Sequence, residues 1–173
     1  MLELLAPTMD MGNIFTKTFD ELNQKFDCNY LFYQYQHLNF KLTFATHSEW
    51  MNVYVNKSMI SNCPLVRVGL QRLSSPLSSV ILRWNDVLPI SKEEKNTIGI
   101  RGDFNICNGI SFGRRRFGAT EYFGLASDIK HLDFARKITL NSFYVKSMMD
   151  CLCQAATIKY LSHNFQKLIF QEY

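Results

Sequence analysis

The sequence predicts an α+β protein, an α-β-α sandwich in which helices cover both faces of a central antiparallel sheet of about five strands. One observation behind this is the order of hydrophobic periodicities, which runs helix, two strands, helices, strand, helix, two strands, helix. A second is the length of 173 residues, which suits a single domain over residues 1–173. A third is the composition, in which 47% hydrophobic and 20% charged residues are typical of a globular chain with a core to bury.

The first part of the chain predicts a helix followed by two paired strands. Apolar residues fall at spacings of three and four over residues 12–26, which is the pattern of an amphipathic helix, and Asp10 is placed to cap it. Two aromatic-rich segments follow, 28–36 and 39–47, in which alternate residues point to alternate faces of a sheet. We therefore expect an antiparallel pair with its turn between the two segments.

The middle of the chain predicts three helices and one strand. Residues 48–56 form a short helix capped by the serine at its start, and 64–73 form a second helix with proline in its first turn. The Ser-Ser-Pro stretch at 74–76 ends that helix. Residues 80–84 are typical of a strand, and 91–102 are typical of a helix that begins at a serine followed by acidic residues and ends near glycines.

The last part of the chain predicts a hairpin and a long helix. Strands are expected over about 105–112 and 119–127, with the arginine triplet 114–116 in a solvated turn between them. Apolar residues at helical spacing then continue from about 139 to 170, a helix roughly 45 Å long if it is unbroken. We expect a helix of that length to project beyond its own core or to have a kink.

Composition and patterning exclude several protein classes. The longest apolar runs are far shorter than the ~20 residues of a membrane-spanning helix. The N-terminus has no basic region before its apolar stretch, so we expect a cytoplasmic protein with no membrane partner. Five cysteines without regular spacing predict reduced thiols. A net charge of +4, with mostly scattered basic residues, gives no basis for nucleic-acid binding through this chain alone.

The clusters that could carry chemistry are weak. The sequence holds no paired carboxylates, glycine-rich phosphate loop or oriented triad, so we expect neither an enzyme nor a cofactor. Cys151 and Cys153, with His131 and His163, have metal-binding side chains, but residues two apart on a helix point to different faces, and we expect no metal site. Nothing orients Cys63 toward a histidine, so a buried, inert thiol is the simpler interpretation.

The strongest candidate for a site is an aromatic pair. Trp50 and Tyr54 are four residues apart, so on a helix both side chains project from one face. Each combines a large apolar body with one hydrogen-bond donor, which suits a pocket for an amphiphilic small molecule. Core aromatics whose polar tips reach backbone carbonyls have the same spacing, so the pair alone leaves both interpretations open.

An ordered set of motifs surrounds this pair. It comprises Trp50, Tyr54, Pro64, a strand ending at Trp84, then Phe104-Asn105-Ile106-Cys107-Asn108-Gly109-Ile110-Ser111 and Phe123-Gly124-Leu125-Ala126-Ser127. Over about residues 12–165 the set resembles the autoinducer-binding domain of LuxR-type quorum-sensing transcription regulators. The resemblance implies a five-stranded antiparallel sandwich that holds an acyl-homoserine lactone between the sheet and the helices.

The resemblance also implies roles for individual residues. By that resemblance, Trp50 donates its indole N–H to the lactone carbonyl, and Tyr54 lines the acyl amide. Trp84 packs on the lactone ring, and Ser127 faces the pocket from the final strand. Tyr33 is one of the strand aromatics that we expect to form partly core and partly pocket wall.

Cys63 stands where the family has an aspartate that accepts the amide N–H of the ligand. A thiol is a weak hydrogen-bond partner, and the loss of a charged acceptor for a buried amide costs about 1.5–3 kcal/mol. We therefore expect the ligand to be a non-standard signal molecule that is acyl-homoserine-lactone-like.

Two functions are compatible with these features. The leading one is a non-enzymatic quorum-sensing domain that binds a small amphiphilic signal and acts as a homodimer or as a heterodimer with a regulator. The alternative is a ligand-free interaction protein that pairs with a regulator through its long C-terminal helix.

Family regulators continue into a helix-turn-helix domain, whereas this sequence ends at Tyr173 without one, so we expect no DNA reading by this chain. A cavity beside Trp50 and Tyr54 would favour sensing, and a packed core would favour interaction alone.

Overall fold

A single antiparallel sheet forms the centre of the molecule. The computed structural model describes residues 10–170, with side chains as far as residue 164. The strand order in the sheet is β2-β1-β5-β4-β3. The strands are β1 (Tyr30–His37), β2 (Phe40–Ala45), β3 (Ser78–Arg83), β4 (Gly109–Arg116) and β5 (Ala119–Ala126).

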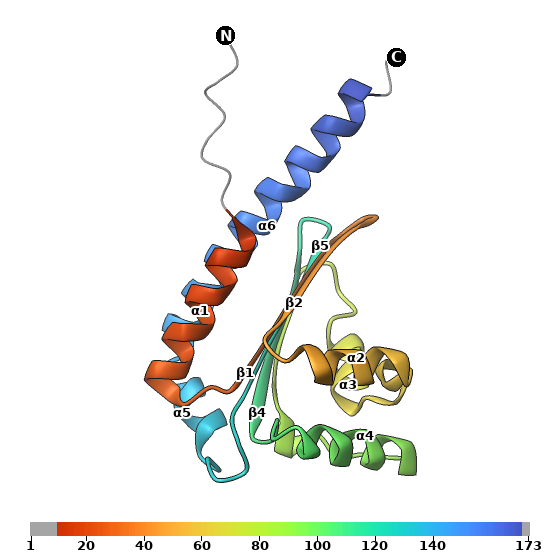
Figure 1. The fold of residues 1–173 in the computed structure, drawn as a ribbon. Coiled ribbons are helices and arrows are strands. Elements are labelled where there is room, and N and C mark those ends of the chain that lie inside the picture. The colour runs from red at the N-terminus through yellow and green to blue at the C-terminus, as the bar shows by residue number, and fades with distance from the viewer. Residues whose placement is uncertain (1–9, 171–173) are drawn as a thin grey trace.

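Helices cover both faces of this sheet (Figure 1). One face carries α1 (Met11–Phe26), α5 (Phe134–Leu140) and α6 (Ser142–Phe170), and the other carries α2 (Ser48–Asn56), α3 (Pro64–Arg72) and α4 (Lys92–Asp103). Two short 3-10 helices, η1 (Met59–Asn62) and η2 (Trp84–Asp86), follow α2 and β3. The predicted α-β-α sandwich is therefore confirmed. In the part of the chain that the structure describes, no helix is both long enough and apolar enough to cross a bilayer.

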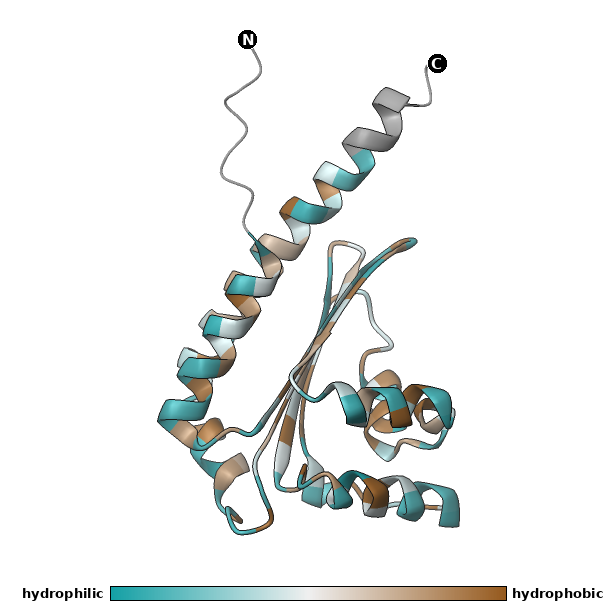
Figure 2. Ribbon diagram, in the orientation of Figure 1, coloured by the Kyte–Doolittle hydropathy of each residue, from teal (hydrophilic) through white to brown (hydrophobic). Residues whose placement is uncertain are grey.

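The first helix shows how the apolar spacing produces a layer. The carboxylate of Asp10 accepts a hydrogen bond from the backbone N–H of Gly12 at 3.0 Å, which confirms the predicted cap. Phe15, Leu22 and Phe26 are buried in the core that α1 shares with the sheet and α6. Figure 2 shows hydrophobic and hydrophilic residues following one another along α1, as expected of a helix that packs with one side.

The strands divide their side chains between the two helical layers. In β1, Leu31, Tyr33 and Tyr35 belong to the core under α1 and α6, whereas Tyr30 and Phe32 pack with α2 and η1. Residues paired across antiparallel strands point to the same face, so the register extends this alternation over the sheet. The parity of a strand position therefore decides which layer its side chain enters.

The structure corrects the predicted hairpin between β4 and β5. β4 begins at Gly109 rather than about 105, because Asn105 has a φ of 57° and its N–H donates to a carbonyl of α4. The strand then continues through Arg116, and the turn is Phe117-Gly118, with φ values of 51° and 79°. Two positive φ values in a two-residue loop are typical of a type I′ hairpin. The arginine triplet thus lies in β4, and its prediction as a solvated turn is wrong.

Arg114 instead belongs to a polar network under α6. The sheet register pairs it with Glu121, and the two side chains form an ion pair. Glu121 is 1% exposed and also accepts a hydrogen bond from the Tyr33 hydroxyl at 2.7 Å. Arg114 makes a second ion pair, with Asp150 of α6. The network therefore connects the long helix to three strands of the sheet, β1, β4 and β5.

Two helix ends differ from the prediction. Ser48 is the first residue of α2 rather than its cap, and His47 precedes it without a capping side-chain hydrogen bond. The predicted helix over about 139–170 begins at Ser142 as α6, because a separate short helix that was not predicted, α5, ends at Leu140. The far end of α6 also extends past the layers of the sandwich (Figure 1). The expectation of a projecting end is therefore met, whereas α6 itself is one continuous helix from Ser142 to Phe170.

Candidate functional site

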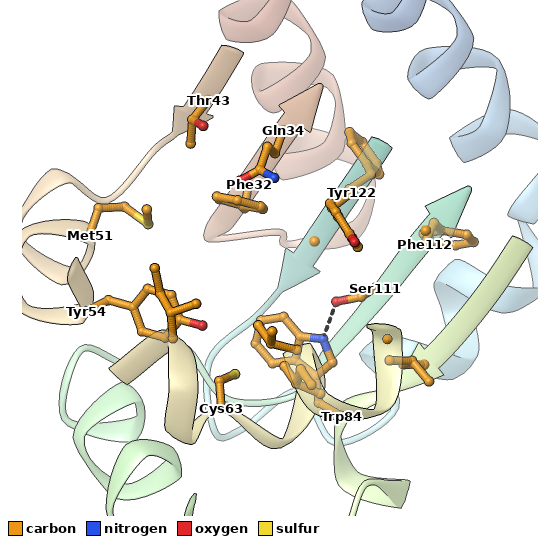
Figure 3. A pocket seen from close by; sticks show the side chains of 18 of the residues that line it. Phe32, Gln34, Thr43, Met51, Tyr54, Cys63, Trp84, Ser111, Phe112 and Tyr122 are labelled. Carbon is orange, nitrogen blue, oxygen red and sulfur yellow. Dashed lines mark hydrogen bonds between the residues drawn. The ribbon is translucent and has the colours of Figure 1, made fainter. Parts of the chain in front are cut away.

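A cavity of about 520 Å³ lies between the sheet and the helices α2 and α3 (Figure 3). Residues of all five strands form one wall, and α2, η1, α3 and α4 contribute to the other. The strands contribute Phe32, Gln34, Thr43, Val80, Ser111 and Tyr122, among others, and the helices contribute Trp50, Met51, Tyr54, Leu65 and Arg101. The side chains on this face of the sheet therefore leave a space large enough for a small molecule.

The cavity has a buried end and an exposed end. Trp50 is 4% exposed, and Cys63 and Trp84 are each 6% exposed. Gln36 and Lys41, near the tip of the β1–β2 hairpin, also line the cavity but are exposed to solvent. A ligand would therefore have one end enclosed by aromatic side chains and the other near the mouth.

The aromatic pair of α2 lies at the buried end. The rings of Trp50 and Tyr54 have centroids 5.1 Å apart, and the ring of Phe104 lies 5.7 Å from that of Trp50. Burial raises the pKa of the Tyr54 phenol, and the neighbouring Cys63 raises it further. Burial also raises the pKa of Tyr30, whose hydroxyl donates to the sulfur of Met51 at 3.6 Å. Both phenols are therefore neutral hydroxyl groups at physiological pH.

Trp84 is held in place by three neighbours. Its indole N–H donates a hydrogen bond to the hydroxyl of Ser111 at 2.8 Å (Figure 3). The guanidinium of Arg101 lies over the indole, 4.2 Å from the ring centroid. A Cβ atom on Gly109 would come within 2.3 Å of the indole, so the ring packs directly on bare backbone. This arrangement requires glycine at position 109.

Cys63 precedes α3 and directs its side chain toward the cavity (Figure 3). Its backbone is extended, with φ −100° and ψ 116°, which is the conformation that a residue before proline prefers. The Cys63-Pro64 dipeptide thus fixes both the start of α3 and the position of the thiol. The structure thus brings Trp50, Tyr54, Cys63 and Trp84 together around one cavity.

Two of the predicted site residues do not line the cavity. Tyr33 points to the opposite face of the sheet, where its hydroxyl donates to Glu121, because it is one residue out of phase with Phe32. Ser127 follows β5, and its hydroxyl donates to the carbonyl of Asp27 at 2.6 Å and lies 2.7 Å from Nδ1 of His131. The expectation that these two residues face the pocket is therefore corrected.

Sequence reasoning missed Ser111 and Arg101, both of which line the cavity. Ser111 alternates with the buried Phe112 in β4, so a strand register would have placed it on the pocket face. Arg101 lies in α4, a helix whose buried residues are Glu94, Thr97 and Arg101 rather than an apolar stripe. No hydrophobic pattern indicates which side of such a helix is inward.

The site and fold were compared with known proteins. A family model described as "autoinducer binding domain" matches residues 18–156. No curated protein sequence matches the chain.

Three solved structures resemble the fold. SdiA of Escherichia coli is 12% identical, with a TM-score of 0.57 over 89% of this chain and 62% of SdiA. The ligand-binding domain of VqsR from Pseudomonas aeruginosa is 12% identical, with a TM-score of 0.56 over 84% of this chain and 94% of that domain. CepR2 of Burkholderia cenocepacia, an N-acylhomoserine-lactone-dependent factor of the LuxR family, is 19% identical over 85% of this chain and 93% of CepR2, with a TM-score of 0.49.

Proposed function

Because the chain belongs to the autoinducer-binding domain family of LuxR-type regulators, which has a signal-sensing role, we propose that it binds a small amphiphilic signal in the cavity beside Trp50 and Tyr54. The observation that supports this most is the cavity itself. Its volume of about 520 Å³ falls in the range of small-molecule pockets. A protein that acts only by pairing has no need of such a space.

The lining of the cavity suits an acyl chain attached to a polar head. Leu65, Val66, Leu70, Val80 and Leu82 supply aliphatic contacts along the walls. At the buried end, the Trp50 indole and the Tyr54 hydroxyl are donors that can hold a carbonyl or an amide. SdiA has been solved in complex with octanoyl-rac-glycerol, which is a molecule of this shape. We therefore propose an acyl-homoserine-lactone-like signal as the ligand class.

Extraction of the bound molecule tests this proposal. The protein is purified from cells grown with octanoyl glycerol and N-octanoyl-homoserine lactone, denatured, and the released small molecules are measured by mass spectrometry. Gly124→Leu is the pocket-blocking variant, because a Cβ at Gly124 makes only ordinary contacts, 3.6–3.8 Å from Phe32, Ser111 and Trp84, and the rest of the side chain enters the cavity. Gly99→Leu is the matched control, since nothing lies within 4 Å of a Cβ there.

The proposal predicts near-stoichiometric release of an acyl compound from the unaltered protein and from Gly99→Leu, and little from Gly124→Leu. Equal release from all three proteins would place the ligand outside this cavity. No release from any of them would contradict the proposed ligand class.

A second candidate role rests on the projecting part of α6. Ile158 and Leu161 are 44% and 59% exposed, on a helix that extends beyond the sandwich layers. We propose that this surface pairs with a second copy or with a regulator. Sedimentation velocity at micromolar concentration tests self-association: the unaltered chain should sediment as a dimer and Leu161→Glu as a monomer. A monomeric unaltered chain would contradict self-association through α6.

A further inference from the structure

One cation lies at the buried end of the cavity. Arg101, near the C-terminus of α4, is 9% exposed and lines the cavity together with Trp84 and Cys63. Its guanidinium stacks on the indole of Trp84 at 4.2 Å from the ring centroid. When the flat face of a guanidinium stacks on a ring, its N–H groups lie in the plane of the guanidinium and remain available as hydrogen-bond donors.

Arg101 has no counter-charge in the described part of the chain. No carboxylate there forms an ion pair with it, and its Nε atom is buried without a hydrogen-bond partner. The side chains whose charges would interact with it are the thiols of Cys63 and Cys107 and the phenols of Tyr30 and Tyr54. No aspartate or glutamate is among the described residues that line the cavity.

Two other arginines of this protein, Arg67 and Arg114, have carboxylate partners. Arg67 pairs with Glu94 at 2.7 Å, and Arg114 pairs with Glu121 and Asp150. An unpaired buried charge is strongly destabilising, whereas a paired and hydrogen-bonded one is tolerated. A ligand that enters the cavity can therefore supply the anionic partner that the protein itself does not give Arg101.

We propose that Arg101 binds a carboxylate on the head group of the signal, so that the preferred ligand is an acyl chain ending in a carboxylate rather than in a neutral lactone. This inference rests on the proposed function and specifies its ligand. The planar guanidinium matches a carboxylate with two parallel hydrogen bonds. Burial raises the pKa values of Tyr30 and Tyr54, so these two phenols are neutral and supply no counter-charge to Arg101.

The shape of the cavity sets the orientation of such a ligand. The carboxylate lies at the buried end, next to Arg101 and Trp84. The acyl chain runs across the sheet, past Gly124 of β5 and Gln34 of β1, toward the exposed Lys41 of β2. This orientation pairs the charge with Arg101 and leaves the chain on the aliphatic walls.

Calorimetry with a matched pair of probes tests the proposal. N-octanoyl-homoserine and N-octanoyl-homoserine lactone have the same chain and amide, but only the ring-opened form has a carboxylate at neutral pH. The unaltered protein should bind the ring-opened acid at least about tenfold more tightly. Arg101→Met should lose this preference, whereas Arg83→Met, which changes an exposed arginine on β3, should keep it.

The outcomes separate the two proposals. Equal or tighter binding of the lactone by the unaltered protein would overturn the inference about Arg101 and leave the proposed function intact. An acid preference that persists in Arg101→Met would also overturn it. Absence of binding of both probes and of octanoyl glycerol would overturn the proposed function as well. If Arg101→Met does not fold, the affinities of the unaltered protein for the acid and for the lactone still test whether the cavity prefers a carboxylate.

Discussion

The indole N–H of Trp84 donates a hydrogen bond to the hydroxyl oxygen of Ser111, with 2.8 Å between the two heavy atoms. The bond joins η2 to β4 across the wall of the cavity (Figure 3). Trp84 also packs on Gly109 and under the guanidinium of Arg101, so one ring contacts two residues that line the cavity, Ser111 and Arg101, and the backbone beside them. The shape of the buried end therefore depends on this contact.

Replacement of Ser111 by alanine should lower the free energy of unfolding by about 1–2 kcal/mol, because the buried indole N–H then lacks its protein partner. Urea denaturation measures the change. The control is Ser79→Ala, at an exposed position of β3, which should change stability by less than about 0.5 kcal/mol. Equal effects of the two substitutions would show that the hydrogen bond contributes little.

Gly109→Ala should disrupt the pocket without any change of charge. The new methyl group would lie 2.3 Å from the Trp84 ring, so the indole must move, at a cost of roughly 1–3 kcal/mol. Gly99→Ala, on an open side of α4, should instead be neutral or stabilise the protein by about 0.5–1 kcal/mol. Thermal unfolding followed by the fluorescence of the tryptophans measures both effects. A Gly109→Ala protein with unchanged emission and stability would contradict the observed packing.

Glu121→Gln tests the network that connects α6 to the sheet. Glutamine keeps the size of the side chain but removes the charge opposite Arg114, and the loss should approach 3 kcal/mol because Glu121 is buried. Asp133→Asn breaks the exposed ion pair with Lys137 and should cost less than about 0.5 kcal/mol. Guanidinium denaturation of the two variants provides the comparison, and similar costs would argue against a buried network.

Cys63→Asp should change which head group the cavity prefers. The new carboxylate would lie near Arg101 and could accept the amide N–H of a lactone ligand. A charged acceptor contributes about 1.5–3 kcal/mol, so affinity for N-octanoyl-homoserine lactone should rise roughly 10- to 100-fold. Affinity for the ring-opened acid should fall, because Arg101 would already be paired. Calorimetry that finds both affinities unchanged would mean that position 63 does not contact the head group.

The helical layers and the strand pairs could be predicted from the sequence because their periodicities are local. The spacing of Phe15, Leu22 and Phe26 defines one helical face whatever lies beyond it. The faces of β1 were harder to predict, because the two alternating sets of side chains are both rich in aromatics. The sets are Tyr30, Phe32 and Gln34, and Leu31, Tyr33 and Tyr35. Only the tertiary arrangement decides which set faces α2, and Tyr33 was therefore predicted on the wrong side.

The remaining differences have similar physical causes. The positive φ values of Phe117 and Gly118 define the turn of the hairpin, and this turn sets the register of β4 against β5. Without that register, the pairing of Arg114 with Glu121 could not be predicted from the sequence. Arg101 is in a helix without an apolar stripe, and its burial depends on Trp84, seventeen residues earlier in the sequence. Long-range packing of this kind leaves no local pattern.

The fluorescence of the two tryptophans tests most directly whether a signal molecule enters the cavity. Trp50 and Trp84 are the only tryptophans of the chain, and both line the cavity, so a ligand bound there must change their surroundings. In a titration with N-octanoyl-homoserine and with its lactone, the unaltered protein and Gly99→Leu should show a saturable change in emission, and Gly124→Leu should show none. An unchanged emission of the unaltered protein with both probes, or an equal saturable change in Gly124→Leu, would contradict binding in this cavity.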